Sequence, residues 1–203
     1  MGRRFSVVSA TWIVVAALAA LVVWIVAAFN ALVQRRNRIA NAYAQIDVQL
    51  KRRYDLIPNL VEVAKRYLTH EASTLEAVAR ARGAAVTAAA AARARPTDAA
   101  VVTVLAAAER DLGGSMGRLM AVAEAYPELK ADATMQSLSE ELTSTENRIG
   151  FARQAYNDEV LAYNDAAMQF PTLVAARLFG FAPAAMMQST QNAQEREAPR
   201  LAF

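Results

Sequence analysis

Hydrophobic residues recur every three or four positions along most of the chain, which is the spacing of amphipathic helices. No stretch shows the sustained alternation of apolar and polar residues that is typical of strands. The first run of this kind after residue 35 contains Ile39, Tyr43, Ile46, Leu50, Tyr54 and Ile57. The pattern therefore predicts an all-α fold.

Pro58 predicts a break in this first helix. Proline lacks the backbone N–H and its ring clashes with the preceding turn, so it is tolerated mainly in the first turn of a helix. We expect one helix to end within residues 54–57 and a second to begin near Pro58. The basic residues 51–53 would then lie near the negative end of the first helix, and Asp55 near the positive end of the second.

Three more prolines, Pro96, Pro127 and Pro171, predict the ends of the following helices. The last long run, from Met135 to Phe170, keeps steps of three or four throughout and would be about 54 Å long at 1.5 Å per residue. Long helices joined by short turns pack antiparallel. The sequence thus predicts an elongated antiparallel helical bundle.

A stretch without charge, residues 5–34, precedes the bundle. It is long enough to cross a bilayer and longer than the apolar region of a cleaved signal peptide. We therefore expect an anchor over residues 1–34, spanning the membrane at about 8–29, then the bundle over residues 35–182. The tail, 183–203, shows no period and is expected to be disordered.

Arginines flank the apolar stretch on both sides. Arg3 and Arg4 precede it, while Arg35, Arg36 and Arg38 follow it. The larger number after the stretch favours, by a small margin, a cytoplasmic bundle in a bacterial inner or plasma membrane. Because they lie next to the span, the last three are the candidates for contact with lipid headgroups.

The composition argues against several kinds of function. With 22 basic and 19 acidic residues the net charge is only +3, so there is no basic footprint for nucleic acid. There is no cysteine and one histidine, His70, so thiolate and multi-histidine metal sites are excluded. His70 and Glu71 lack the partners of a zinc or triad site. We expect no catalytic residues, metal, cofactor or small-molecule substrate.

The remaining candidates are polar residues that share a helix face. Asp47 and Asp55 each lie four residues before a polar partner. Glu146, Asn147 and Arg148 of the last helix could pair with the charges of residues 46–62, for example Arg148 with Asp47. A Tyr-Asn pair recurs seven residues apart in the last helix, at 156–157 and 163–164. Solvated capping charges and an amphipathic seam edge are the favoured interpretations; a partner-binding cluster and a groove are the alternatives. The candidate residues are Asp47, Lys51, Arg52, Asp55, Asn59, Arg148, Tyr156 and Asn157.

Several stretches resemble the LemA family: FNALVQRRNRI, IDVQLKRRYDLIPNLVE, HEASTLEAVARAR, RLMAVAEAYPELKA and TENRIGFARQAYNDEVLAYNDAAMQFP followed by FGF. The resemblance runs from about Phe29 to Phe181. It implies a bacterial membrane protein with one N-terminal anchor and an antiparallel helical bundle, without an established enzymatic activity or cofactor. Family links to magnetosome formation and to membrane-protease genes imply a scaffold or adaptor role.

These observations together predict a non-enzymatic scaffold or adaptor in the membrane. Its partners would be other membrane proteins or further copies of itself, because long amphipathic helices offer extended edges to other helices. Two alternatives stay open. One is a regulator or cofactor of a membrane protease, and the other is a lipid-binding protein that remodels the membrane.

Overall fold

The computed structural model describes residues 2–187, with side chains from Thr11 onward. This part of the chain forms six helices and no strand, which confirms the predicted all-α fold. The helices are α1 (Gly2–Lys65), α2 (Ala72–Ala94), α3 (Ala99–Ala123), α4 (Pro127–Ala131), α5 (Ala133–Met168) and α6 (Thr172–Leu178).

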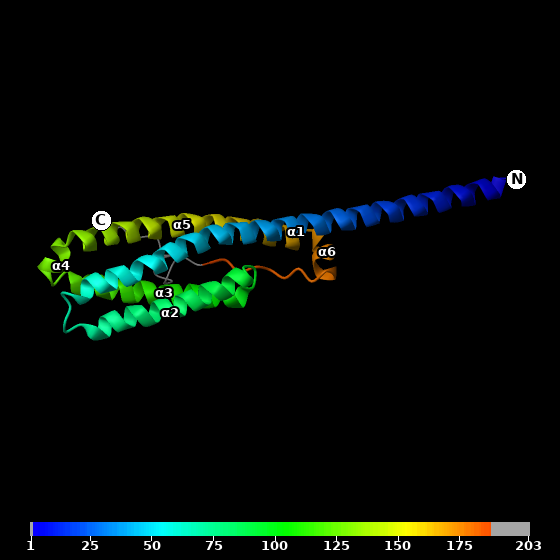
Figure 1. Cartoon of the computed structure of the whole chain (residues 1–203). Helices are drawn as coiled ribbons and strands as arrows, with labels where there is room; N and C mark the ends of the chain where they lie inside the picture. The colour runs from blue at the N-terminus through cyan, green and yellow to red at the C-terminus, as the bar shows by residue number, and fades with distance from the viewer. Residues whose placement is uncertain (1, 188–203) are drawn as a thin grey trace, which may run out of the picture.

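Four long helices run side by side in an elongated, antiparallel arrangement (Figure 1). α5 lies along the second half of α1, and α2 and α3 form a second pair that packs beneath them. The short helix α4 closes the far end of the bundle. α6 lies at the opposite end, where α1 leaves the bundle, and runs across the direction of α1 (Figure 1).

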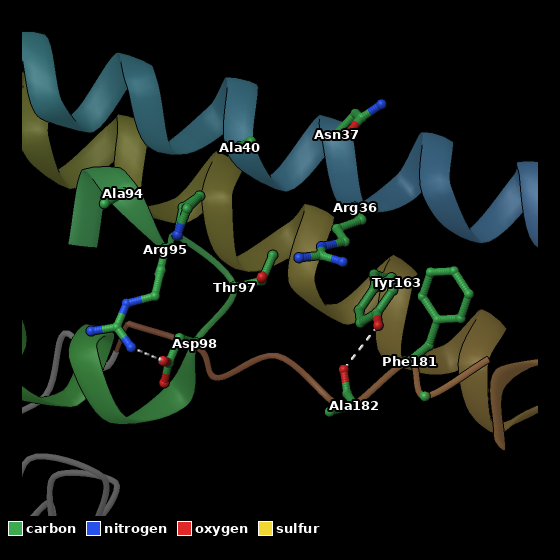
Figure 2. Close-up of a pocket in the computed structure, with 12 residues that line it drawn as sticks. Arg36, Asn37, Ala40, Ala94, Arg95, Thr97, Asp98, Tyr163, Phe181 and Ala182 are labelled. Carbon is green, nitrogen blue, oxygen red and sulfur yellow. Dashed lines mark hydrogen bonds and ion pairs between the residues drawn. The ribbon is translucent and has the colours of Figure 1, made fainter. Parts of the chain in front are cut away.

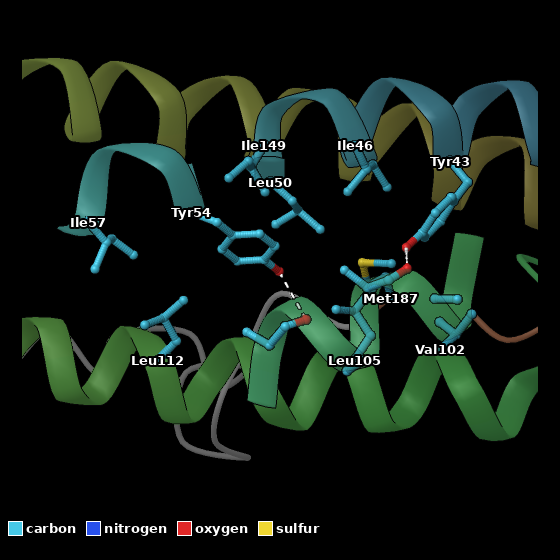
Figure 3. Close-up of a cluster of buried hydrophobic side chains, with 14 of the residues drawn as sticks. Tyr43, Ile46, Leu50, Tyr54, Ile57, Val102, Leu105, Leu112, Ile149 and Met187 are labelled. Atoms are coloured by element: carbon cyan, nitrogen blue, oxygen red, sulfur yellow. Dashed lines mark hydrogen bonds between the residues drawn. The ribbon is translucent and has the colours of Figure 1, made fainter. Parts of the chain in front are cut away.

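One continuous apolar interior is formed by the seams that the sequence predicts (Figure 3). From α1 the seam contributes Ile39, Tyr43, Ile46, Leu50, Tyr54, Ile57 and Leu60, and from α5 it contributes Ile149, Tyr156, Val160 and Tyr163. α3 adds Val102, Leu105, Leu112 and Leu119. Burial of these side chains is the main favourable contribution to the fold, since hydrophobic stabilisation scales with apolar area removed from water.

The predicted break at Pro58 is wrong, because α1 continues through this proline to Lys65. A proline within a helix leaves the carbonyl of the residue four positions earlier without its N–H partner. That carbonyl belongs to Tyr54, and it accepts a hydrogen bond of 2.7 Å from Nε of Arg82 on α2. A donor from another helix thus replaces the missing one. The exposed position of Pro58 also keeps its ring out of the packed interior.

The chain reverses later than predicted, between Lys65 and Ala72. His70 lies in this turn, where its side chain is exposed. The alanine-rich run that the sequence assigned to a helix starting at Pro58 belongs instead to α2. Small side chains let α2 approach α1 and α3 closely, and its buried face includes Ala85, Ala88, Ala89 and Ala92.

The ends of α2, α3 and α5 at Ala94, Ala123 and Met168 lie close to the three prolines that predict them. Asp98 caps α3 by accepting a hydrogen bond from the N–H of Ala100, and Asp132 caps α5 by accepting one from Met135. A side-chain oxygen at this position satisfies one of the free N–H groups of the first turn. Pro127 occupies the first turn of α4, where its missing N–H costs nothing.

The first half of α1 projects beyond the bundle as a single rod (Figure 1). It is long and apolar enough to cross a membrane, and most of its large side chains from Trp12 to Val26 are exposed, with Trp24 and Ile25 half-buried. A buried core helix of a soluble protein would hide such side chains, so this segment suggests a membrane anchor. Bundle contacts begin at Ala28, directly where the apolar stretch ends.

Candidate interaction site

A buried ion pair joins three helices in the middle of the bundle. Arg53 on α1 is 7% exposed and contacts Glu109 on α3 at 2.9 Å and Glu146 on α5 at 3.0 Å. The hydroxyl of Tyr54 donates a further hydrogen bond to Glu109. Because a buried charge is costly unless it is paired, this cluster fixes how α1, α3 and α5 meet.

The protonation of this cluster follows from its burial. Burial raises the pKa of Glu109 above its ordinary value, and the positive charge of Arg53 opposes that shift. Burial and the neighbouring carboxylate of Glu109 raise the pKa of Tyr54. The tyrosine therefore remains a neutral donor at physiological pH. The contacts tie the three helices together.

The predicted charge cluster is divided among separate partners. Asp47 accepts two hydrogen bonds of 2.8 Å from Arg93 on α2, so the predicted pairing of Asp47 with Arg148 is wrong. Arg52 contacts Glu141 on α5 at 2.6 Å. The expected link between α5 and the charges around Pro58 is made by Glu146, as predicted, and also by Glu141, which was not singled out.

The other members of that cluster lie on the surface. Lys51, Asp55, Asn59 and Arg148 are all exposed, and because α1 does not end near them they cap no helix terminus. The capping interpretation is therefore wrong for these residues. Among residues 2–187, no three histidine, aspartate or glutamate side chains come close enough together to hold a metal ion.

Both Tyr-Asn pairs of α5 hold an extended segment of the chain itself. Asn164 makes two hydrogen bonds of 2.9 Å with the backbone N–H and C=O of Ala184. Asn157 does the same with Met187, at 2.8 and 3.0 Å. The expected disorder of the tail is therefore wrong for residues 183–187, while residues 188–203 lie outside the part described.

The two tyrosines complete this arrangement, which we call the Tyr-Asn groove (Tyr156, Asn157, Tyr163 and Asn164). Tyr163 donates to the carbonyl of Ala182 at 2.8 Å, and Tyr156 donates to that of Ala185 at 3.1 Å. The single hydroxyl proton of Tyr156 is shared between this carbonyl and that of Pro96 at 2.9 Å, and burial raises the pKa of Tyr156 to about 12. The two tyrosines are buried in the seam, as the favoured interpretation predicts, and the four side chains together hold a segment of the chain itself. A groove that binds a partner stays a prediction.

The spacing of this groove matches an extended peptide. Seven helical residues rise about 10.5 Å, and three residues of a polyproline-like strand rise about 9.3 Å. Ala184 and Met187, which the two asparagines bind, are both buried. Seven residues before Asn157 stands Gly150, which has no side chain to continue the series. The groove therefore grips a segment of this length mainly through its backbone.

A pocket of about 450 Å³ lies beside this groove, at the end of the bundle near the apolar rod (Figure 2). Arg36 and Asn37 of α1, the loop from Arg95 to Asp98, and Tyr163 line it. Arg95 is already paired with Asp98 at 3.0 Å. The guanidinium of Arg36 lies between Thr97 and Tyr163 in this view.

The three arginines predicted to meet lipid headgroups differ in their surroundings. Arg35 donates a hydrogen bond of 3.2 Å to the carbonyl of Ala162 on α5, so it also holds the bundle together. Arg36 and Arg38 are exposed. All three lie within about 15 Å of Phe29 along α1, since a helix rises 1.5 Å per residue.

Sequence reasoning missed the residues that tertiary packing selects. Arg53 was assigned to a helix end, and Glu109, Arg82 and Arg93 were not singled out. Each of them pairs with a residue at least 28 positions away, so no local pattern marks it. A buried charge in an otherwise apolar seam, as at Arg53 between Leu50 and Ile57, is the signal that could have been noticed.

Comparisons with known proteins agree with this fold. The LemA family profile matches residues 42–203. Magnetosome protein MamQ of Magnetospirillum gryphiswaldense is 32% identical over 77 residues, which are 38% of this chain and 28% of MamQ. Magnetosome proteins MamQ 1 and MamQ 2 of Paramagnetospirillum magneticum are each 33% identical over 84 residues, 41% of this chain and 31% of theirs. The match thus spans less than a third of the length of these relatives. On the extent of the family match, the chain belongs to the LemA family.

Proposed function

We propose that this chain is a non-enzymatic scaffold or adaptor, anchored by one span in a bacterial inner or plasma membrane. Its partners are other membrane proteins or further copies of itself, and it takes no nucleic acid, cofactor or small-molecule substrate. The bundle lies on the cytoplasmic side, in keeping with the arginines that follow the span.

The observation that carries this proposal is the continuity of α1. One helix forms both the apolar rod and the central strut of the bundle, so the bundle cannot swing independently of the anchor. From Phe29 to Lys65 it extends about 54 Å. A stiff bundle joined rigidly to its anchor presents its side faces at fixed heights above a membrane. This arrangement suits a protein that organises others.

Exposed apolar side chains mark where such a partner would bind. Phe151 on α5 is 74% exposed, and Val48 on α1 is exposed as well. The contact of Arg53 with Glu146 and the edge-to-face contact of Tyr43 with Tyr156 set the antiparallel register, which places Val48 and Phe151 at nearly the same height. Large apolar groups exposed on a rigid face are typical of helix–helix contacts.

The test is crosslinking of the full-length chain in native membranes, followed by purification and mass spectrometry. We expect the wild type to form adducts, either with itself or with a recurring membrane protein. The variant Phe151→Glu should lose them, whereas Asn147→Glu, a matched change on an exposed polar position one turn earlier, should keep them. A wild-type chain that stays monomeric and free of adducts overturns the proposal.

A further inference from the structure

We infer that the membrane-proximal end of the bundle rests on the bilayer through a second contact, separate from the span. This contact is formed by the end of α5 and by α6. The membrane-proximal patch consists of the exposed apolar side chains Met168, Phe170, Val174, Leu178 and Phe179. Its partner is the boundary between lipid headgroups and acyl chains. The inference rests on the proposed anchoring of α1 in a membrane.

The height of this patch is fixed by contacts with Phe29, at the end of the apolar stretch. The ring of Phe29 packs edge-on against Phe179 at 5.0 Å and against Phe181 at 5.6 Å between centroids. Any bilayer that takes up the apolar rod therefore ends at the level of these rings. Because bundle contacts begin at Ala28, no spacer lifts the bundle away from the membrane surface.

The orientation of α6 suits a helix that lies in the plane of the membrane. It runs across the direction of α1 at the end of the bundle (Figure 1). Ala175 and Ala176 are buried against the bundle, while Val174 and Leu178, four residues apart in α6, are exposed on another face, and the exposed Phe170 lies in the turn before the helix. Apolar residues on one face of an interfacial helix typically enter the outer 5–10 Å of the bilayer.

The exposed fractions are high for side chains of this size. Phe170 is 83% exposed and Leu178 is 69% exposed. The patch adjoins the end of the rod through the contact of Phe179 with Phe29. Arg177 of α6 is exposed, and the exposed Arg36 and Arg38 follow Phe29 within about 15 Å along α1. An apolar surface bordered by arginines matches the layering of acyl chains and anionic headgroups. A bilayer is therefore the occupant that this patch fits best.

The experiment uses the absence of cysteine from the chain. Single cysteines replace Leu178, Phe170, Phe151 or Val22 in the full-length protein, and each carries an environment-sensitive fluorophore. The four variants are reconstituted into phosphatidylethanolamine–phosphatidylglycerol vesicles, with or without nitroxide groups at a shallow acyl position. All four side chains are exposed, so labelling should leave the helical content seen by circular dichroism unchanged.

We expect nitroxide lipid to reduce the emission at Leu178→Cys and Phe170→Cys at least about twofold, as for a group at the headgroup–acyl boundary. Phe151→Cys, about 26 Å from Met168 along α5, should be unaffected. Val22→Cys lies within the rod and reports on the anchor itself. Quenching at Val22→Cys without quenching at Leu178→Cys and Phe170→Cys overturns the second contact alone, whereas no quenching at Val22→Cys overturns the anchoring on which it rests.

A second copy of the chain could also cover the patch, and lipid dilution separates the two cases. The measurement is repeated at about one chain per vesicle, where copies no longer meet. If the bilayer is the partner, emission and quenching at Leu178→Cys stay the same. A label that is unquenched by lipid, and whose blue-shifted emission disappears on dilution, identifies a contact between copies and overturns the inference.

Discussion

The replacement of a missing hydrogen bond at Pro58 can be measured with a double-mutant cycle. Nε of Arg82 donates to the Tyr54 carbonyl that Pro58 leaves without a partner. Arg82→Met removes this donor, and hydrogen bonds from charged groups contribute about 1.5–3 kcal/mol. In the Pro58→Ala background the N–H of residue 58 can serve the same carbonyl, so the same change should cost only about 0.5–1 kcal/mol. We therefore expect a coupling energy of about 1–2 kcal/mol.

Pro58→Ala alone should raise the free energy of unfolding by about 1–3 kcal/mol. The upper bound is the propensity difference of about 3 kcal/mol between proline and alanine within a helix. The gain is smaller here because Arg82 already satisfies the carbonyl of Tyr54. For a domain of this size each kcal/mol shifts Tm by about 2–4 °C.

The assay is reversible urea unfolding of the four full-length variants in detergent micelles. Unfolding is monitored by the near-ultraviolet circular dichroism of the tyrosines. Arg80→Met is the matched control, because Arg80 lies on the same helix and pairs only with Glu76 at its exposed surface. It should show no coupling to Pro58→Ala. If the effects of Pro58→Ala and Arg82→Met add within about 0.5 kcal/mol, the replacement of the hydrogen bond is refuted.

Three further outcomes are expected elsewhere in the bundle. Asn164→Ala removes both hydrogen bonds to Ala184, so amide exchange at Ala184 should accelerate about tenfold or more. In a control chain that ends after residue 181, the same substitution should cause no further loss of stability. Tyr156→Phe should lower the free energy of unfolding by about 1–2 kcal/mol, measured by urea unfolding, because its main-chain acceptors lose their donor. The raised pKa of Glu109 means that its contribution to stability is fully present below the unfolded-state pKa and is lost as pH rises through the folded-state pKa. The stability of the wild type relative to Glu109→Gln should therefore fall from pH 4 to pH 7, and a rise would contradict the assignment.

Local rules predicted the long helices well because their apolar seams are continuous. The seam of α5 predicts a helix from Met135 to Phe170, and the observed helix runs from Ala133 to Met168. Pro58 misled the same reasoning, because the compensating donor comes from Arg82 on another helix. Propensity states the cost of a proline, and only the tertiary structure shows whether that cost is offset.

The sequence predicted the side chains of α5 that form the candidate site, but not the segment that they hold. The heptad repeat of Tyr and Asn identified the face of α5 that binds something. Its occupant, residues 182–187, carries no helical or strand period, so composition alone suggested disorder. A segment without regular structure makes no ladder of internal hydrogen bonds, so side chains elsewhere must supply its partners. Tyr163 and Asn164 do so here, but sequence alone could not pair them with that segment.

Because α1 is continuous, the number of residues between the apolar rod and the bundle determines both the height of the bundle and its rotation about the helix axis. Each residue added between the rod and the bundle would lift the far turn by about 1.5 Å and rotate every side face by about 100° about the axis. An insertion of seven residues nearly restores the azimuth, to within about 20°, while moving the far turn outward by about 10.5 Å. The height of the bundle and its rotation about α1 therefore change together. An insertion of a single residue would turn Phe151 away from any neighbour in the membrane plane.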